Sequence, residues 1–368
     1  MLNKGRSEEE LFTFFAEKKS EDLDYDFILS SMCTVPHSVA VRAHCMFMET
    51  NLGDPGLFCG TSSLEQLLIS RFATLFHCPG AGGYATSGGT ESNIQALRLA
   101  KAGRSDSTSP NIIVPDSAHF SFKKACDILG LEMRRVPLTK DFRMDPDLAA
   151  EQVDKNTIAL VGVAGTTEYG MVDPIKSLAA IARQHDLFFH VDAAFGGMVI
   201  PFLDDPVPFD FALPGVTSIA VDPHKMGMST IPCGCLLTRE PDQLRTLNID
   251  TPYLTVKQEY TLAGTRPGAP VASAIAVMDY LGVEGMKAIV SGCMKNTWRL
   301  IAGMETFGIS RAATPDVNVA TFVCDTARVP GPWRVSWTCA KHLRIVCMPH
   351  VHADRIEAFL KEVGKSHA

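Results

Sequence analysis

A histidine and a lysine stand together just beyond a short apolar run that favours a β-strand. The run covers residues 218–221, and Asp222 and a proline separate it from His224 and Lys225. Most lysines are solvated surface residues. Lys225 is followed by apolar residues, however, and partial burial would lower the pKa of its amine and make it a nucleophile. His224 either binds a phosphate or packs in the core.

A carboxylate follows a second apolar run, at residues 187–191. Asp192 comes directly after it, and small residues, including Ala194, come next. A buried aspartate needs a partner, and a lone one most often caps the following turn. Because Asp192 and Lys225 both come at strand ends, both can face one crevice. A carboxylate there suits the protonated nitrogen of a pyridine ring, and the small Ala194 would let a flat ring lie against the backbone.

A glycine-rich turn precedes a helical pattern near residue 90. Ser87, Gly88, Gly89 and Thr90 would place hydroxyls and free backbone N–H groups at the positive end of a helix, which suits a phosphate. The plain alternative is a turn with a Ser/Thr cap. The overlapping residues 80–85 match the dinucleotide pattern G-x-G-x-x-A, but a helical pattern rather than a strand precedes them. The sequence therefore argues against a nicotinamide site.

Two further strand ends carry polar side chains. His119 follows an apolar run at 112–114, and its ring either stacks on a flat ligand or lies in the first turn of a helix. Thr166 follows a run at 158–163, and its hydroxyl can reach a phenolic or phosphate oxygen. Each residue alone is more often structural. Together, clusters at five neighbouring positions of one sheet predict a shared site.

Short apolar strands alternate with amphipathic helices through the first two thirds of the chain. Strands are expected at 112–114, 158–163, 187–191, 218–221 and 235–238, and helices at 62–77, 120–130, 145–154 and 174–185. This order predicts an α/β fold with a mainly parallel sheet covered on both faces. We expect a large domain at 56–270, and a bridging helix with a small α+β domain at 271–368. The segment 1–55 would pack on the large domain or on a partner subunit.

The composition restricts the partners. The 368 residues carry a net charge of −7 without a basic cluster, which argues against nucleic acid. The charged N-terminus does not read as a secretory signal, and no apolar run reaches the roughly 18 residues of a membrane span. The eleven scattered cysteines favour free thiols in a reducing cytoplasm over disulfides or a metal site. We therefore expect a cytoplasmic protein.

Taken together, these motifs resemble those of a known enzyme family. The segments SGGTESN (87–93), HVDAAFGG (190–197) and DPHKMG (222–227), with His119, resemble the group II pyridoxal-phosphate decarboxylases. The similarity is greatest to the archaeal L-tyrosine/L-aspartate decarboxylases of methanogens. It extends to SMCTVPH (31–37), ETNLGDPGLF (49–58), TPYL (251–254) and GTR (264–266), and so covers nearly the whole chain.

The resemblance implies a type I aminotransferase-like fold with a seven-stranded sheet, and a homodimer with shared active sites. Lys225 would hold pyridoxal 5'-phosphate through an imine, Asp192 would pair with the ring nitrogen, and His119 would stack on the ring. The remaining cofactor contacts would be Ser87, Gly88, Gly89, Thr90, Thr166, Ala194 and His224, with Gly264 and Thr265 from the other subunit.

The resemblance also suggests how the substrate is held. Arg266 would bind its carboxylate, or else bridge the dimer interface. Tyr253 would donate a proton from a closing loop, or else belong to an ordinary interface loop. The implied reaction converts L-tyrosine to tyramine, L-aspartate to β-alanine, or both, for methanofuran and coenzyme A biosynthesis. Two alternatives stay open: a carbon–carbon lyase of the sphingosine-phosphate lyase type, and a cofactor-binding protein without turnover.

Overall fold

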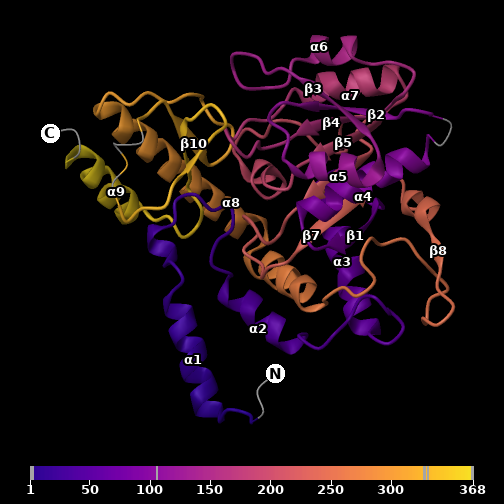
Figure 1. The fold of residues 1–368 in the computed structure, drawn as a ribbon, viewed down its shortest axis with the longest axis horizontal. Coiled ribbons are helices and arrows are strands. Elements are labelled where there is room, and N and C mark those ends of the chain that lie inside the picture. The colour runs from indigo at the N-terminus through magenta and orange to yellow at the C-terminus, as the bar shows by residue number, and fades with distance from the viewer. Residues whose placement is uncertain (1–3, 105–106, 326–328, 330, 366–368) are drawn as a thin grey trace.

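A seven-stranded sheet forms the centre of the larger lobe (Figure 1). The structure is a computed structural model that describes residues 4–104, 107–325, 329 and 331–365. The strand order is β1-β7-β6-β5-β4-β2-β3, and β7 runs antiparallel to both of its neighbours while the others pair in parallel. The strands are β1 (Gly82–Thr86), β2 (Asn111–Pro115), β3 (Glu132–Val136), β4 (Thr157–Val163), β5 (Phe188–Asp192), β6 (Ser218–Val221) and β7 (Gly234–Thr238).

Helices bury both faces of this sheet. They are α3 (Cys59–Leu75), α4 (Gly89–Ala102), α5 (Ser121–Leu129), α6 (Pro146–Glu151) and α7 (Ile175–Gln184). Alternate residues of a strand point to opposite faces. In β2, Ile112 packs in a core with residues of α4 and α5, whereas Ile113 joins the core that includes α3 and α7. Burial on both sides explains why the strands read as continuous apolar runs.

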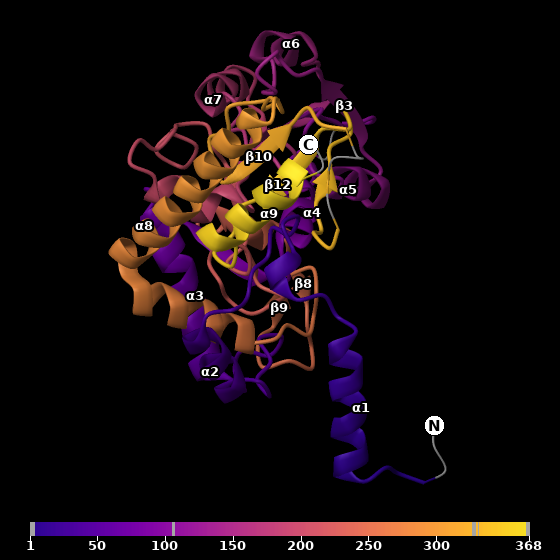
Figure 2. The same cartoon turned by 90° about the vertical axis from the view of Figure 1, so that its left-hand side faces the viewer.

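The C-terminal third forms a smaller lobe beside the large one. The helix α8 (Ala269–Thr306) leads into it and bends at Gly282, whose φ of 58° is not helical. The lobe contains a three-stranded antiparallel sheet, in the order β10 (Val319–Phe322), β12 (Leu343–Val346) and β11 (Ser336–Trp337), and the helix α9 (Ala353–Lys365) (Figures 1 and 2). The predicted α/β class with a small α+β unit is confirmed.

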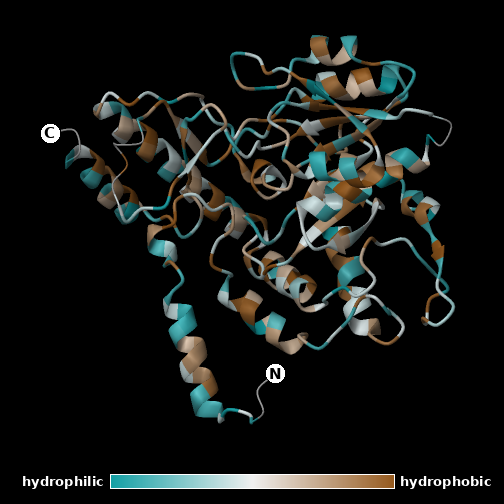
Figure 3. Cartoon of the chain, in the orientation of Figure 1, coloured by the Kyte–Doolittle hydropathy of each residue, from teal (hydrophilic) through white to brown (hydrophobic). Residues whose placement is uncertain are grey.

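The N-terminal segment divides its contacts. The helix α2 (Ser38–Met46) lies against α8, and Leu29 donates its N–H to the Arg334 carbonyl of the smaller lobe at 2.8 Å. The helix α1 (Glu8–Ser20) begins at a capping box and extends away from both lobes (Figures 1 and 2). Its middle is hydrophobic and it buries no residue (Figure 3). The segment therefore contacts the smaller lobe, which the sequence did not predict.

Short elements complete the chain. The strands β8 (Ile249–Asp250) and β9 (Gln258–Glu259) form a small hairpin beside the large sheet (Figure 1). The eleven cysteines are all free thiols. Within the described part of the chain, no helix combines the length and the apolar character needed to span a bilayer.

Candidate functional site

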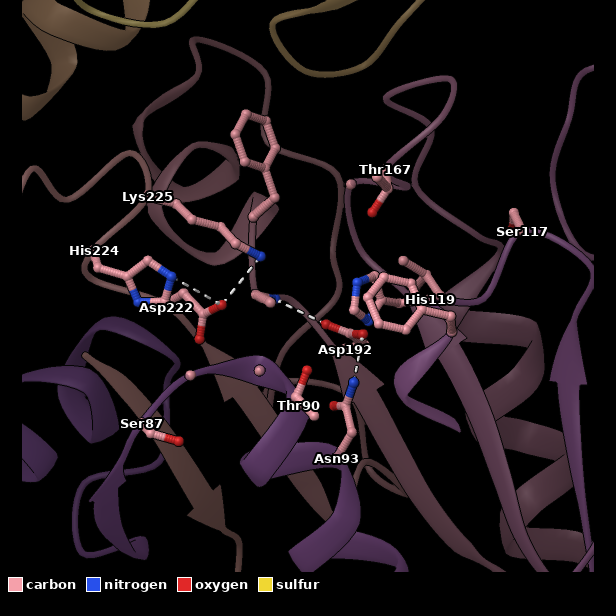
Figure 4. Close-up of a pocket in the computed structure, with 17 residues that line it drawn as sticks. Ser87, Thr90, Asn93, Ser117, His119, Thr167, Asp192, Asp222, His224 and Lys225 are labelled. Atoms are coloured by element: carbon pink, nitrogen blue, oxygen red, sulfur yellow. Dashed lines mark hydrogen bonds and ion pairs between the residues drawn. The ribbon is translucent and has the colours of Figure 1, made fainter. Parts of the chain in front are cut away.

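A cavity of about 330 Å³ opens where the parallel strands of the large sheet end. Because the carboxyl ends of β2, β4, β5 and β6 meet at one edge, residues that follow them converge there. Figure 4 shows these side chains pointing into one space. The lining consists of Ser87, Gly88, Gly89, Thr90, Asn93, Ser117, His119, Phe120, Val163, Gly165, Thr167, Asp192, Ala194, Phe195, Asp222, His224 and Lys225.

The beginning of α4 forms one wall of the cavity. Gly88 precedes the helix with a φ of 145°, a conformation that favours glycine, and no side chain caps the first turn. A Cβ atom on Gly88 would lie 3.1 Å from His224 Cε1, and one on Gly89 would lie 3.0 Å from Ala194 Cβ. The two glycines thus keep the helix N-terminus open to the cavity. Free N–H groups at the positive end of a helix suit an anion such as phosphate.

Asp192 is held with its carboxylate in the cavity. It is 6% exposed, although it lines the pocket (Figure 4). Asn93 Nδ2 donates to one carboxylate oxygen at 2.9 Å, and the Ala194 N–H donates to the other at 3.1 Å. Each oxygen has lone pairs left, so the carboxylate can still accept a hydrogen bond from a ligand.

Lys225 is paired with a carboxylate that the sequence analysis did not assign. Its Nζ lies 3.0 Å from Asp222 Oδ2, and the two side chains are 20% and 2% exposed. Burial by itself would lower the pKa of Lys225, but the charges of Asp222 and Asp192 outweigh it and raise that pKa. The expectation of a lowered pKa was therefore wrong, because it considered only the apolar neighbours. Asp222 Oδ1 is buried and has no hydrogen-bond partner among the residues that the structure describes.

Two histidines line the cavity. His224 Nδ1 lies 2.5 Å from the Cys233 carbonyl oxygen, and Nε2 lies 3.9 Å from Asp222 Oδ2. His119 accepts a hydrogen bond from the Ser121 N–H at 3.3 Å, which orients its ring. Burial lowers the pKa of His119, so the imidazole is neutral near pH 7. A neutral, oriented ring is suited to stacking on a flat ligand.

Of the two threonines that follow β4, Thr167 lines the cavity and Thr166 does not. Thr166 is fully buried, and its Oγ1 accepts a hydrogen bond from the Met171 N–H at 3.0 Å. Thr167 lines the cavity instead. This corrects the sequence-based assignment: the hydroxyl of Thr166 closes its own loop and does not face the cavity.

Arg266 does not offer a free guanidinium to the cavity. Its Nη1 lies 2.5 Å from Glu65 Oε1 and 3.1 Å from the Ala85 carbonyl oxygen, and its Nη2 donates to the Leu52 carbonyl at 3.1 Å. Both Nη atoms are therefore occupied within the chain. The structure does not support the expected carboxylate-binding role, and Arg266 instead ties together three segments of the large lobe.

Three other predicted residues lie outside the cavity of their own chain. Tyr253 is 85% exposed, on the loop between β8 and β9. Gly264 and Thr265 are exposed as well, and none of the three lines the pocket. The loop is tied to the chain's own residue Asp54, which accepts a hydrogen bond from the Thr255 N–H at 3.1 Å.

A second buried arginine, Arg344 on β12, lies next to the cavity wall. Its Nε donates to the Thr167 carbonyl at 2.5 Å and its Nη1 to the Ser30 carbonyl at 3.0 Å. Its Nη2 is buried, and no hydrogen-bond partner for it lies in the described part of the chain. Burial lowers the pKa of Arg344 to about 10, so the side chain remains a cation at neutral pH. The sequence analysis missed it, although it is a lone charge within the apolar run Leu343–Val346.

The amino-acid sequence matches a known domain family. A family model described as the pyridoxal-dependent decarboxylase conserved domain matches residues 59–309, more than half of the chain. The chain belongs to the pyridoxal-dependent decarboxylase family. A protein named probable L-tyrosine/L-aspartate decarboxylase from Methanoregula boonei is 74% identical over 368 residues, covering 100% of both chains. One of the same name from Methanosphaerula palustris is 67% identical, covering 99% of this chain and 100% of that one.

Solved structures show the same fold. A sphingosine-1-phosphate lyase from Burkholderia pseudomallei superposes with a TM-score of 0.90 at 24% identity, covering 100% of this chain and 92% of that one. A glutamate decarboxylase from Lactobacillus brevis also superposes with a TM-score of 0.90, at 20% identity, covering 100% and 93%. The predicted fold is confirmed. The pyridoxal-dependent decarboxylase is accordingly an enzyme that removes the carboxylate of an amino acid with pyridoxal phosphate, as predicted.

Proposed function

We propose that this enzyme converts L-tyrosine to tyramine, L-aspartate to β-alanine, or both, with release of CO2. The observation that carries the proposal is the convergence of Lys225, Asp192 and an open helix N-terminus on one cavity. These are the groups that an imine-forming cofactor with a ring nitrogen and a phosphate requires. The choice of substrates follows from the names of the relatives that are 67% and 74% identical.

The residues present fit pyridoxal phosphate. Gly88 and Gly89 leave the phosphate site open, His119 offers a flat neutral ring, and Asp192 offers an anion to the ring nitrogen. Lys225 supplies the amine that forms the covalent link. When bound, the cofactor withdraws the electron pair that remains after the carboxylate leaves as CO2. Asp192 favours that withdrawal because it keeps a proton on the ring nitrogen.

Arg344 is our candidate for the residue that binds the α-carboxylate of the substrate. Its guanidinium is cationic and buried, and Nη2 has no partner within the described chain. Arginine binds a carboxylate through two parallel hydrogen bonds, which also orients it. Arg344 does not itself line the cavity, but its Nε holds the carbonyl of Thr167, which does, so the guanidinium lies directly behind the cavity wall.

We also propose a homodimer in which each chain completes the other's site. Met46 at the end of α2, Met48 just beyond it and Tyr253 are 73%, 69% and 85% exposed, and such exposure suits side chains that a second chain would cover. Phe12 and Phe15 of α1 are likewise exposed. Since Gly264 and Thr265 do not line their own cavity, they are available to the partner. Light scattering tests this proposal, and a monomer that is fully active would contradict it.

The test of function is a panel of L-amino acids incubated with the purified enzyme and added cofactor. We expect labelled CO2 and the matching amine from tyrosine, aspartate or both, measured by gas capture and mass spectrometry. Cleavage of a phosphorylated long-chain base to an aldehyde would instead favour the lyase alternative. Cofactor binding without turnover of any substrate would instead favour the alternative of a non-catalytic cofactor-binding protein.

A further inference from the structure

Three buried polar side chains form a continuous hydrogen-bonded chain behind the carboxylate of Asp192. Ser218 Oγ lies 2.8 Å from His190 Nδ1, and His190 Nε2 lies 2.9 Å from Asn93 Oδ1. Asn93 Nδ2 in turn donates to Asp192 Oδ2 at 2.9 Å. Ser218 and His190 are 0% exposed and Asn93 is 1% exposed, so water does not take part in these contacts.

Donor counting fixes the direction of the hydrogen bonds that Asn93 makes in this chain. Asn93 Nδ2 donates both of its hydrogens, one to Asp192 and one to Ser121 Oγ, each at 2.9 Å. Rotating the amide would point its oxygen at a carboxylate, two acceptors with no proton between them. Asn93 Oδ1 is therefore an acceptor, and His190 Nε2 must carry the hydrogen that it accepts.

The remaining contact depends on the charge of His190. Burial lowers the pKa of His190 to about 4, although the charge of Asp192 acts in the opposite direction. The imidazole is then neutral at physiological pH and has one N–H, on Nε2. Its Nδ1 accepts, and the Ser218 hydroxyl donates. Besides Asp192, the groups around the ring are uncharged: Ser218 on β6, Asn93 on α4 and the Phe122 ring on α5, at 6.2 Å.

We propose that His190 and Asn93 are positioning residues for Asp192, through a one-way relay from Ser218 to His190, Asn93 and the carboxylate. The inference rests on the proposed role of Asp192 toward the ring nitrogen. N–H donors stabilise the ionised form of a carboxylate and fix its plane. Because the relay is uncharged, it does so without a competing cation. A protonated His190 would neutralise part of the charge that Asp192 directs into the cavity.

The backbone explains why these residues meet. His190 and Asp192 are two apart on β5, so their side chains lie on the same face of the sheet. His190 is paired in register with Ser218 of β6. Asn93 lies in α4, just after the glycines that keep the helix N-terminus open. The relay therefore fixes the position of the phosphate-binding wall relative to the carboxylate that meets the ring nitrogen.

The first test reads the proton position directly. Histidine labelled with ¹⁵N, assigned through His190→Gln, is followed by long-range ¹⁵N–¹H correlation in the wild-type enzyme with and without cofactor. We expect a neutral ring with its hydrogen on Nε2 throughout pH 5 to 8, because even pH 5 lies about 1 unit above the pKa of about 4 to which burial lowers His190. An imidazolium at pH 7, or the hydrogen on Nδ1, would overturn the proposal.

The second test separates positioning from packing. His190→Leu removes the donor to Asn93, whereas His190→Gln keeps an N–H group that can reach it. We expect His190→Leu to weaken cofactor binding about tenfold, the effect of one lost hydrogen bond to a charged network. The pH midpoint of the bound cofactor's absorbance should also move down, because the ring nitrogen loses its proton more readily.

His190→Gln should restore both properties to within about threefold of the wild type. If His190→Leu does not fold, Asn93→Ser, which shortens the relay at the next position, is measured in the same way. A variant that binds cofactor with an unchanged absorbance midpoint would refute the relay. A wild-type enzyme that releases no CO2 would refute the proposed function instead, so the two failures are distinguishable.

Discussion

Replacing Asp222 by asparagine should make the amine of Lys225 more reactive in the cofactor-free enzyme. The substitution keeps the shape of the side chain but removes a charge 3.0 Å from Lys225 Nζ. Both side chains are largely buried, so solvent screens the pair only weakly. Burial lowers the pKa of Lys225, and without the charge of Asp222 only Asp192 would oppose that effect strongly. The pKa of Lys225 should therefore fall.

The size of the effect follows from the contact. An opposite charge within about 4–6 Å shifts a pKa by about 1–3 units, and each unit is a factor of ten in the free amine. The rate at which formaldehyde and borohydride methylate Lys225 at pH 8 should therefore rise about tenfold or more in Asp222→Asn. Mass spectrometry of the peptide that contains Lys225 measures this rate.

The matched control is Asp210→Asn. Asp210 is also buried, but it pairs with His77 rather than with Lys225. The control should leave the methylation rate of Lys225 unchanged. An equal or slower rate in Asp222→Asn would show that the pair does not hold the lysine as an ammonium. The raised pKa of Lys225 also stabilises the folded protein. This stabilisation is complete below the unfolded pKa of about 10.4 and is lost as the pH rises through the folded pKa. The alkaline loss of stability should therefore disappear in Asp222→Asn.

Four further substitutions test the site. Lys225→Ala should lose the visible absorbance of the bound cofactor, and persistence of that band would disprove the covalent link. Asp192→Asn should bind cofactor but turn over at least about 100-fold more slowly in a steady-state assay, and near-normal turnover would exclude its role. Arg344→Gln should raise KM about 10- to 100-fold through lost hydrogen bonds to a charge, whereas an unchanged KM would place the carboxylate elsewhere. Arg266→Gln should cost about 3 kcal/mol of stability in urea unfolding because Glu65 loses its partner, and a neutral effect would contradict that pairing.

The strand ends were the most predictable part of the molecule. Buried parallel strands read as continuous apolar runs, and polar residues that follow them must meet at one edge of the sheet. This reasoning brought Asp192, Lys225, His119 and the glycine turn to one cavity. The prediction depended on the backbone arrangement of parallel strands and not on any side-chain contact, so the sequence alone was enough for it.

Two strands of the large sheet were not predicted, for different physical reasons. β1 (Gly82–Thr86) begins with two glycines and so resembled a turn, yet both glycines pair with β7. A Cβ atom on Gly83 would lie 2.5 Å from the Leu236 carbonyl oxygen of β7, so the close approach of the two strands requires glycine there. β3 (Glu132–Val136) is an edge strand in which three of five residues are charged and only Val136 is buried, so it lacks the apolar run that marks a buried strand. In both strands the pairing partner, which is distant in sequence, decides the structure.

Polar partners within the site were also out of reach. Asn93 and Asp222 lie within motifs that were identified, at 87–93 and 222–227, but their roles depend on which atoms they meet. Asn93 is a full helical turn from the glycines and touches Asp192, 99 residues later. The difference between Thr166 and Thr167 is a single residue in a loop, where no periodicity tells which hydroxyl faces inward.

The two arginines show most clearly what a sequence withholds. Arg266 was favoured because it follows the Gly264-Thr265 pair in a motif, and a guanidinium near an active site suggests a carboxylate ligand. Glu65 and two carbonyls occupy both of its Nη atoms, so it holds the scaffold together, and only its buried Nε has no partner within the described residues. Arg344 comes from the smaller lobe, about 120 residues beyond Lys225, and keeps one buried nitrogen unpartnered beside the cavity wall. A buried cation with an unused donor is costly unless something binds it, which makes Arg344→Gln the sharper test of how the substrate is oriented.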